Sequence, residues 1–259
     1  MAGVAGRIAL VTGAGSAEGI GFATALALAK AGAIVAVTST SKRIFERCEE
    51  LGEGHVGLIA DLTNPEETDN LITAVRKKFG PIEIVVNNAG MVQTGKRIKA
   101  SLLEKISDAE WQQHLNLNVT TAFNITRAVL PSMQRRKYGR IVNVASVTGP
   151  LVTNPRSAGY SAAKAAMTGL TRATAIENAA RGITCNAVLP GWIATATSSK
   201  PEIIAGKATP TRRPGRADEV AAANLFLASE EASYINGAML VVDGANTIVE
   251  FKGASDGWY

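Results

Sequence analysis

Short apolar runs alternate along the chain with longer segments in which apolar residues recur at helical spacing. The apolar runs lie at residues 7–12, 33–37, 56–60, 82–86, 138–145, 183–189 and 238–242. Runs of this length that are apolar at nearly every position are typical of strands buried on both faces. Helical patterns occupy residues 22–30, 65–79, 108–133, 157–180 and 217–228. This alternation predicts an α/β fold, in which a doubly wound (Rossmann-type), mostly parallel seven-stranded sheet is covered by helices on both faces.

Composition narrows the classes of protein that fit this pattern. The 259 residues are 46% hydrophobic and include 25 glycines, which suits a sizeable core with many tight turns. No apolar run reaches eighteen residues and the first residues lack the layout of a signal peptide, so we expect no membrane association. Cys48 and Cys185 are too few for a disulfide framework or a zinc site, which favours a cytoplasmic location and predicts no metal.

The net charge of +5 raises the question of nucleic-acid binding. The basic residues are scattered, and their short clusters lie at expected helix ends or in loops, where cations are common. A solvated surface that also attracts an anionic cofactor or substrate explains the charge better than a nucleic-acid site. We therefore expect no nucleic-acid partner.

A glycine-rich turn follows the first expected strand and precedes the first expected helix. It holds Gly13, Gly15, Gly19 and Gly21 within nine positions. Missing side chains let the backbone approach a ligand closely, and free amides at a helix start favour negative charge. The turn therefore predicts a cradle for the pyrophosphate of a dinucleotide.

The second expected strand ends in residues 38–43, Thr-Ser-Thr-Ser-Lys-Arg, with no acid before Glu46. A site for NAD usually places an acid here to bind the ribose hydroxyls. Hydroxyls and two cations are better suited to a 2′-phosphate, so we favour NADP(H), with NAD(H) as the alternative. A polar helix cap followed by a basic helix start would explain the same residues without a phosphate.

Tyr160 and Lys164 are four positions apart, so on a helix they project from the same face. A phenol loses its proton near pH ~10, and a nearby ammonium favours the phenolate and lowers that pKa. The pair therefore predicts a tyrosine that gives and takes a proton. Ser146 ends an expected strand, where its hydroxyl could bind the same substrate oxygen. Alone, the pair also fits an exposed helix face without chemistry.

Two asparagines, Asn116 and Asn118, lie inside the expected helix at residues 108–133. Asparagine is unfavourable there because its side chain competes for backbone groups. At least one should therefore make a tertiary contact, and a hydrogen bond from Asn118 to a neighbouring loop would already satisfy this expectation. Residues 196–216 are rich in Ser, Thr, Pro, Lys and Arg, and we expect them to form a mobile lid over the substrate.

Motifs typical of one family occur in that family's order over nearly the whole chain. They are Thr12 and Gly13 through Gly21, Asp61 with Leu62, residues 87–90, Asn118, Ser146, Tyr160 with Lys164, and Pro190 with Gly191. The chain resembles the short-chain dehydrogenase/reductase family, and within it the 3-oxoacyl-carrier-protein reductase-like branch, which usually uses NADPH.

The resemblance implies a catalytic tetrad of Asn118, Ser146, Tyr160 and Lys164. Tyr160 would donate a proton to the carbonyl oxygen, and Ser146 would orient that oxygen. Lys164 would lower the pKa of the tyrosine and hold the nicotinamide ribose, and Asn118 would position a water. The implied cofactor contacts are Gly13, Gly15, Ser16, Gly19, Ile20, Ser39, Thr40, Arg43, Asp61, Leu62, Asn88, Ala89, Gly90, Tyr160, Lys164, Pro190, Gly191, Ile193 and Thr195.

The implied function is an NAD(P)(H)-dependent oxidoreductase that interconverts a ketone and a secondary alcohol by hydride transfer. Such an enzyme is a carbonyl reductase or alcohol dehydrogenase, and 3-oxoacyl compounds are among its candidate substrates. The alternative is a non-catalytic, NAD(P)-sensing binding protein. The resemblance also implies a homotetramer, or a homodimer, built through the helices that carry Asn118 and Tyr160.

No internal repeat, linker or low-complexity stretch divides the chain. We therefore expect a single domain over residues 1–259. Residues 1–90 would form mainly its cofactor-binding half and residues 91–244 its catalytic and substrate half. Residues 245–259 would form a C-terminal tail.

Overall fold

The computed structural model describes residues 3–90 and 101–250. Residues 1–2, 91–100 and 251–259 lie outside the described residues. They include the start of the expected catalytic and substrate half and the end of the predicted C-terminal tail. A seven-stranded sheet forms the centre, and every pair of neighbouring strands in it is parallel. Its strands are β1 (Ile8–Thr12), β2 (Ile34–Ser39), β3 (Val56–Ile59), β4 (Ile84–Asn87), β5 (Gly139–Val144), β6 (Ile183–Pro190) and β9 (Met239–Val242).

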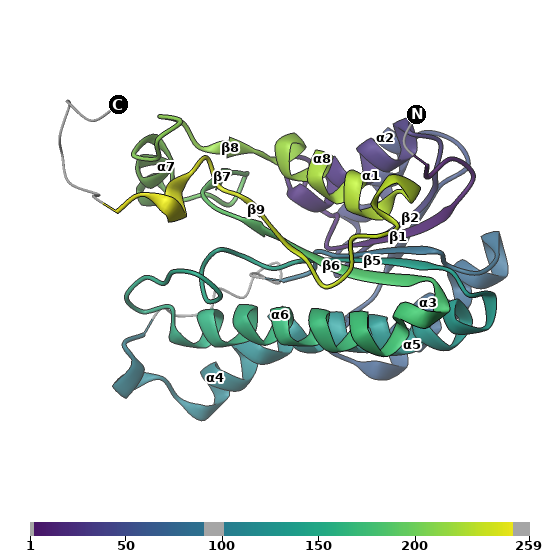
Figure 1. Cartoon of the computed structure of the whole chain (residues 1–259), viewed down its shortest axis with the longest axis horizontal. Coiled ribbons are helices and arrows are strands. Elements are labelled where there is room, and N and C mark those ends of the chain that lie inside the picture. The colour runs from purple at the N-terminus through teal and green to yellow at the C-terminus, as the bar shows by residue number, and fades with distance from the viewer. Residues whose placement is uncertain (1–2, 91–100, 251–259) are drawn as a thin grey trace.

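Helices cover both faces of this sheet, as the alternating pattern predicts (Figure 1). Helices α1 (Ile20–Lys30), α2 (Arg43–Leu51) and α8 (Ala217–Ala228) lie on one side. Helices α3 (Pro65–Phe79), α5 (Thr121–Arg136) and α6 (Ala158–Asn178) lie on the other, and α4 (Asp108–Leu115) packs against α6. Short 3₁₀ turns complete the fold at η1 (Leu103–Lys105), η3 (Ala179–Arg181), η4 (Glu230–Ala232) and η5 (Asn246–Ile248).

The strand order is β3-β2-β1-β4-β5-β6-β9, so the chain changes direction across the sheet between β1 and β4. The strands are parallel, and their carboxyl ends therefore meet at one edge. In a doubly wound sheet, ligands bind at this edge beside the point where the strand order reverses. The glycine turn after β1 and the Asn88-Ala89-Gly90 loop after β4 both lie there.

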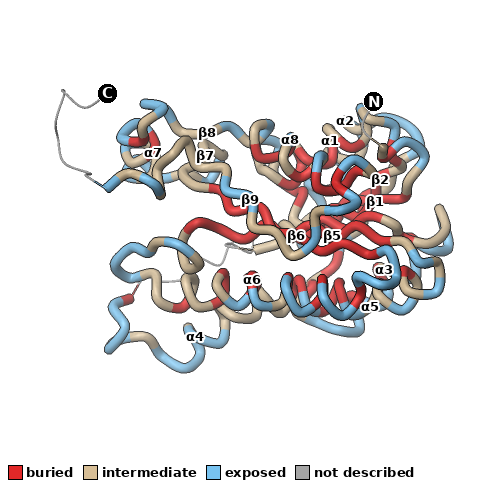
Figure 2. The backbone as a smooth tube through the Cα atoms, viewed as in Figure 1, coloured by how far each residue is buried: buried red, intermediate tan, exposed pale blue. Residues whose placement is uncertain are grey.

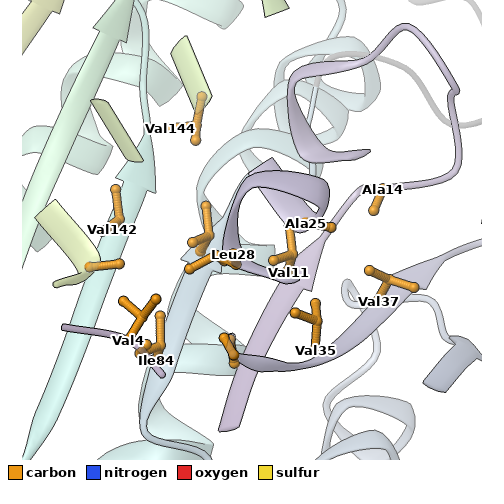
Figure 3. Packing of buried hydrophobic residues seen from close by; sticks show 14 of the residues in the cluster. Val4, Val11, Ala14, Ala25, Leu28, Val35, Val37, Ile84, Val142 and Val144 are labelled. Atoms are coloured by element: carbon orange, nitrogen blue, oxygen red, sulfur yellow. The ribbon is translucent and has the colours of Figure 1, made fainter. Parts of the chain in front are cut away.

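The core is split between the two faces of the sheet because successive side chains of a strand point in opposite directions. Ala9 and Val11 of β1 pack with the residues of α1 and α8, whereas Leu10 packs with those of α3 and α5. Figure 3 shows Val11 beside Ala25 and Leu28 of α1. In Figure 2 the buried backbone runs along the strands, and exposed residues lie on the outer faces of the helices. Burial on both faces explains why these strands are continuously apolar.

Of the five predicted helices, two have the predicted bounds, α1 and α6 differ from theirs by one or two residues at an end, and one is interrupted. Helices α3 and α8 occupy the predicted ranges, and the backbone N–H of Glu66 donates to the Asn64 side chain at 2.9 Å, which caps α3. The expected continuous helix at residues 108–133 is instead α4, a π-helical turn η2 (Asn116–Thr120) and α5, which extends to Arg136. Periodicity alone does not distinguish such a turn from α-helix, because the apolar face continues through it.

Residues 196–216, expected to form a lid, contain helix α7 (Lys200–Lys207) and the second strand of a small second sheet. That sheet pairs β7 (Ile193–Ala194) with β8 (Gly215–Arg216). Ser199 and Glu202 cap the start of α7 reciprocally, because the Ser199 N–H donates to the Glu202 carboxylate and the Glu202 N–H to the Ser199 hydroxyl. Over residues 3–90 and 101–250, no helix combines the length and apolarity needed to cross a membrane.

Candidate active site

The glycine turn after β1 is shaped by close contacts that side chains would prevent. Gly13 has φ +67°, and a Cβ built on it would lie 2.8 Å from the Cα of Ala89. A Cβ on Gly21 would lie 2.5 Å from Asn88 Nδ2 and 2.6 Å from the Gly13 oxygen. Helix α1 begins beyond Gly19, and within the described chain no side chain caps it or places an acid in its first turn. The turn therefore presents backbone amides at a helix start, which suits a dinucleotide pyrophosphate.

The loop after β4 is bonded directly to this turn. The Thr12 hydroxyl accepts hydrogen bonds from the N–H groups of Asn88 at 3.0 Å and Ala89 at 2.9 Å. The Asn88 amide donates to the carbonyls of Thr12 and Gly13 at 3.0 and 3.1 Å. Residues 88–90 and the glycine turn therefore form one rigid wall at the carboxyl edge of the sheet.

The hydroxyl cluster after β2 faces the same turn. A Cβ built on Gly15 would lie 2.8 Å from Ser39 Oγ, so Ser39 borders the glycine turn. Arg43 is the first residue of α2, and its Nε donates to Ser41 Oγ at 3.3 Å. Lys42 occupies the N-cap position, and no capping hydrogen bond from a side chain is present at this end among the described residues. The Ser39 hydroxyl donates to the Ser41 carbonyl at 3.0 Å and accepts from the Ser41 N–H at 3.3 Å, so part of the cluster forms the turn before α2.

Asp61 and Leu62 follow β3, the next strand beyond β2. The Asp61 carboxylate accepts from the N–H and hydroxyl of Thr63 at 2.9 and 2.7 Å, which fixes the turn after this strand. Leu62 is buried, and its carbonyl accepts from Asn124 of α5 at 3.0 Å. These hydrogen bonds fix the backbone of residues 61–63 at the carboxyl end of β3, the outermost strand on this side of the sheet.

Strand β5 and helix α6 bring together three of the predicted catalytic side chains. Ser146 follows the end of β5, and its hydroxyl accepts from the Thr148 N–H at 3.0 Å. Tyr160 and Lys164 lie on one face of α6, with the Lys164 Nζ 5.8 Å from the centroid of the Tyr160 ring. Lys164 is buried and donates to the Val144 carbonyl at 2.9 Å.

Burial dominates the proton affinities of Tyr160 and Lys164. Burial raises the pKa of Tyr160 to about 12; a hydrogen bond with Ser146 opposes this rise, and the negative charge of Glu202 adds to it. Burial also lowers the pKa of Lys164 to about 8. The net pKa therefore moves opposite to the lowering expected from Lys164, because in the protein by itself the partial withdrawal of the half-buried phenol from water is the larger effect. Near neutral pH, Tyr160 is a protonated phenol.

Asn118 joins this group through the π-helical turn. Its side chain is fully buried, and its amide donates to the carbonyl of His114 at 3.1 Å. A Cβ built on Gly90 would lie 3.0 Å from Asn118 Oδ1 and 3.5 Å from Lys164 Nζ, so both polar atoms converge on this glycine. The tertiary contact expected of at least one asparagine is thus present. Single-turn π segments of this kind occur frequently at functional sites.

The loop after β6 closes the other side of the edge. The Pro190 carbonyl accepts from the Val147 N–H at 3.0 Å, which ties this loop to the end of β5. A Cβ on Gly191 would lie 2.6 Å from the Cβ of Asp243, and only glycine permits that approach. Ile193 belongs to β7, and the Thr195 N–H donates to Ser198 Oγ at 3.0 Å.

Two features of the site were not predicted from the sequence. Glu202 of α7 acts on the pKa of Tyr160 across the space between α7 and α6. His114 of α4 holds the Asn118 side chain through its backbone carbonyl. The asparagines at 116 and 118 could have indicated the π-helical turn, and the spacing of Ser199 and Glu202 could have indicated the start of α7. Neither pattern, however, predicts a contact with Tyr160.

The predicted residues therefore gather along one edge of the sheet. The glycine turn and the cluster after β2 form an extended backbone cradle, and the groups around Tyr160 lie at the ends of β5 and β6. The absence of side chains at Gly13 and Gly21 fits a bound dinucleotide, because a methyl group at either position would collide with the opposite wall. The arrangement can place a proton donor beside a carbonyl oxygen.

Comparison with known proteins identifies close relatives over almost the whole chain. A family model described as enoyl-(acyl carrier protein) reductase matches residues 13–246. The 3-oxoacyl-[acyl-carrier-protein] reductase FabG of Haemophilus influenzae is 39% identical over 246 residues, covering 92% of this chain and 97% of that protein. Oxidoreductase UcpA of Escherichia coli K12 is 38% identical over 260 residues, covering 95% and 96%.

A solved structure shares the fold. The crystal structure of a "putative gluconate dehydrogenase" from Agrobacterium tumefaciens superimposes with a TM-score of 0.86 at 32% identity. The match covers 95% of this chain and 98% of that one. The similarity therefore extends through both the glycine-rich and the tyrosine-bearing parts of the sheet edge.

Proposed function

Because this chain belongs to the short-chain dehydrogenase/reductase family, we propose that Asn118, Ser146, Tyr160 and Lys164 are its catalytic tetrad. The protein is an NAD(P)(H)-dependent oxidoreductase that interconverts ketones and alcohols. The observation that carries the tetrad is the convergence of Asn118 Oδ1 and Lys164 Nζ on Gly90, with Tyr160 one turn away on the same face of α6.

Bound NAD(P)(H) supplies or accepts the hydride at its nicotinamide ring. The chain's own residues handle the proton. In reduction, the neutral phenol of Tyr160 donates its proton to the carbonyl oxygen, and the Ser146 hydroxyl orients that oxygen by a hydrogen bond. Lys164 is protonated below its pKa of about 8 and supplies positive charge beside the phenol. Asn118 donates to the His114 carbonyl, and this hydrogen bond fixes the π-helical turn beside Lys164.

We further propose that residues 1–90 mainly hold the cofactor and residues 91–244 mainly hold the substrate, within one domain. NADP(H) is the preferred cofactor, and Ser39, which borders the glycine turn, and Arg43 at the start of α2 would hold its 2′-phosphate. The carrier-protein reductases among the relatives support a 3-oxoacyl substrate. The similar structure, which is described as that of a gluconate dehydrogenase, supports a hydroxy acid. Free thiols at Cys48 and Cys185 support a cytoplasmic location.

Assembly into a homotetramer, or a homodimer, is proposed through the outer faces of α5 and α6. Phe123 on α5 is 42% exposed and Ile176 on α6 is 82% exposed, so both offer apolar surface that such an interface would bury. Light scattering of the purified protein at several concentrations measures the assembly directly. A monomer at all concentrations would contradict this part of the proposal.

The cofactor proposal is tested by matched fluorescence titrations with NADPH and NADH. We expect NADPH to bind more tightly, and Arg43→Ala to weaken NADPH by roughly 10-fold while leaving NADH unchanged, because one charge-assisted contact to a phosphate is lost. Lys77→Ala removes the same charge at an exposed position on α3 and serves as the control. Equal losses in the two variants would indicate general electrostatic attraction and not recognition of the 2′-phosphate.

The tetrad is tested by Tyr160→Phe, assayed with acetoacetyl-coenzyme A and NADPH and with gluconate and NADP⁺. We expect turnover to fall by roughly 10²–10⁴-fold with NADPH affinity retained, because only the proton donor is removed. Tyr234→Phe, at a fully exposed tyrosine, should behave as wild type. Cofactor binding without turnover of any ketone or alcohol would favour the non-catalytic sensing protein, and wild-type activity in Tyr160→Phe would exclude the mechanism.

A further inference from the structure

Helix α4 packs against α6, and one especially close contact lies at the start of α6. A Cβ built on Gly159 would lie 2.5 Å from Cδ2 and 2.8 Å from Cγ of His114. Gly159 is buried in the first turn of α6. Only glycine leaves room for the imidazole, so the two residues form a matched pair.

This pair lies between two parts of the proposed tetrad. Gly159 directly precedes Tyr160, so the position of its backbone sets where the phenol begins. On the other side, the His114 carbonyl accepts the side-chain amide of Asn118 at 3.1 Å. The same residue therefore contacts the segment that carries Tyr160 and the side chain that faces Lys164 across Gly90.

The imidazole contributes shape at this position, and not charge. Burial lowers the pKa of His114, with a smaller opposing effect from the charge of Glu110, so the ring is neutral at neutral pH. Its Nδ1 is buried and has no hydrogen-bond partner within the described part of the chain. The flat ring fits against a position without a side chain, and packing is the interaction it makes there.

We propose that His114 is a positioning residue that, through its contact with Gly159, sets the distance between Asn118 and the face of α6 that carries Tyr160 and Lys164. The inference rests on the proposed role of Tyr160 as proton donor. A displacement of about 1 Å in a reacting group can lower a rate by roughly 10²-fold. A change in this packing should therefore alter turnover without altering the cofactor cradle, which lies on other strands.

The test is a double-mutant cycle on His114→Ala and Gly159→Ala, measured as kcat and KM for acetoacetyl-coenzyme A with NADPH. We expect each single variant to lower kcat by roughly 10- to 100-fold while KM for NADPH stays within about 2-fold. In the double variant the new methyl group occupies space left by the ring, so kcat should recover at least about 5-fold over Gly159→Ala alone. Gly169→Ala, on the same helix, is the matched control, since a Cβ built on Gly169 meets nothing within 4 Å.

A second substitution separates packing from proton transfer by the imidazole. His114→Phe keeps a flat ring and should retain kcat within about 5-fold of wild type. A loss in His114→Phe as large as in His114→Ala, or additive losses in the cycle, would overturn the proposal. If Gly159→Ala does not fold, the kcat and KM values of His114→Ala and His114→Phe still decide. An active Tyr160→Phe enzyme would reject the proposed function, whereas an inactive one with an additive cycle would reject the positioning role alone.

Discussion

Two side chains act on the phenol of Tyr160 in opposite directions, in addition to its burial. The Ser146 hydroxyl lowers the pKa of Tyr160 through a hydrogen bond, and the Glu202 carboxylate raises it through its charge. Reduction of a ketone requires the protonated phenol, whereas oxidation of an alcohol requires the phenolate. Because the pKa of Tyr160 is raised to about 12, the protein by itself favours the form needed for reduction.

Neutralising Glu202 should therefore change the pH dependence of the oxidative direction. Glu202→Gln removes the negative charge, which favours the phenolate and lowers the pKa of Tyr160. Glutamine can still cap α7 with Ser199. We expect alcohol oxidation near pH 9 to rise roughly 2- to 5-fold relative to wild type. The measurement is a pH–rate profile, and Glu177→Gln at the far end of α6 is the control for charge. A profile unchanged by Glu202→Gln would contradict this electrostatic role.

At the scale of elements, the ends of the strands determine the site. Thr12 joins β1 to the loop after β4, and the Val147–Pro190 bond joins the ends of β5 and β6. The π-helical turn between α4 and α5 directs Asn118 inward to Gly90, and the Asn118 amide also donates to the His114 carbonyl one turn earlier. The site is therefore assembled from loops that parallel pairing brings to one edge.

The glycine turn should tolerate no side chain at its helix start. Gly21→Ala places a methyl group 2.5 Å from Asn88 Nδ2, so the wall formed by the turn and the β4 loop must separate. We expect affinity for NADPH to fall at least roughly 10-fold, measured by fluorescence titration. Gly169→Ala adds a methyl group in open space on α6 and should bind normally with equal or higher stability. Normal binding by Gly21→Ala would show that this contact does not shape the cradle.

Across the whole molecule, a cluster at the edge opposite the site holds distant segments together. Glu230 accepts from Arg7 and from Arg140, each at 2.9 Å, and the ring of Tyr138 lies 4.0 Å from one guanidinium and 4.6 Å from the other. The Arg140 side chain is only 4% exposed and also donates to the Gly182 carbonyl. The cluster joins the N-terminal strand, β5 and the segment after α8.

Removing the carboxylate from this cluster should destabilise the fold without affecting chemistry. Glu230→Gln leaves the nearly buried charge of Arg140 without its carboxylate partner. We expect the free energy of unfolding to fall by about 1–2 kcal/mol, and the loss is no larger because Glu230 itself is partly solvated. Urea unfolding measures this loss, and kcat in the folded range should be unchanged. Glu53→Gln, at an exposed loop position, is the control. Equal stabilities of the two variants would mean that the cluster contributes little.

The sequence by itself determined the seven strands of the central sheet and the positions of the motifs, but not α7 or the small second sheet. Alternating apolar runs and helical patterns predicted the strands of a doubly wound sheet and the bounds of α3. Such features depend on spacing and on residue types within one segment, so they are visible before any segment meets another. The same locality allowed the Tyr160–Lys164 face to be identified.

Only the tertiary structure decided the contacts between segments. It interrupted the helix at residues 108–133 with a π-helical turn, reversed the expected direction of the Tyr160 pKa, and brought Glu202 and His114 to the site. A pKa depends on burial and on every nearby charge, and a helix–helix contact depends on the shapes of both surfaces. Neither quantity is encoded in the spacing along one segment, because each arises only when the chain is folded.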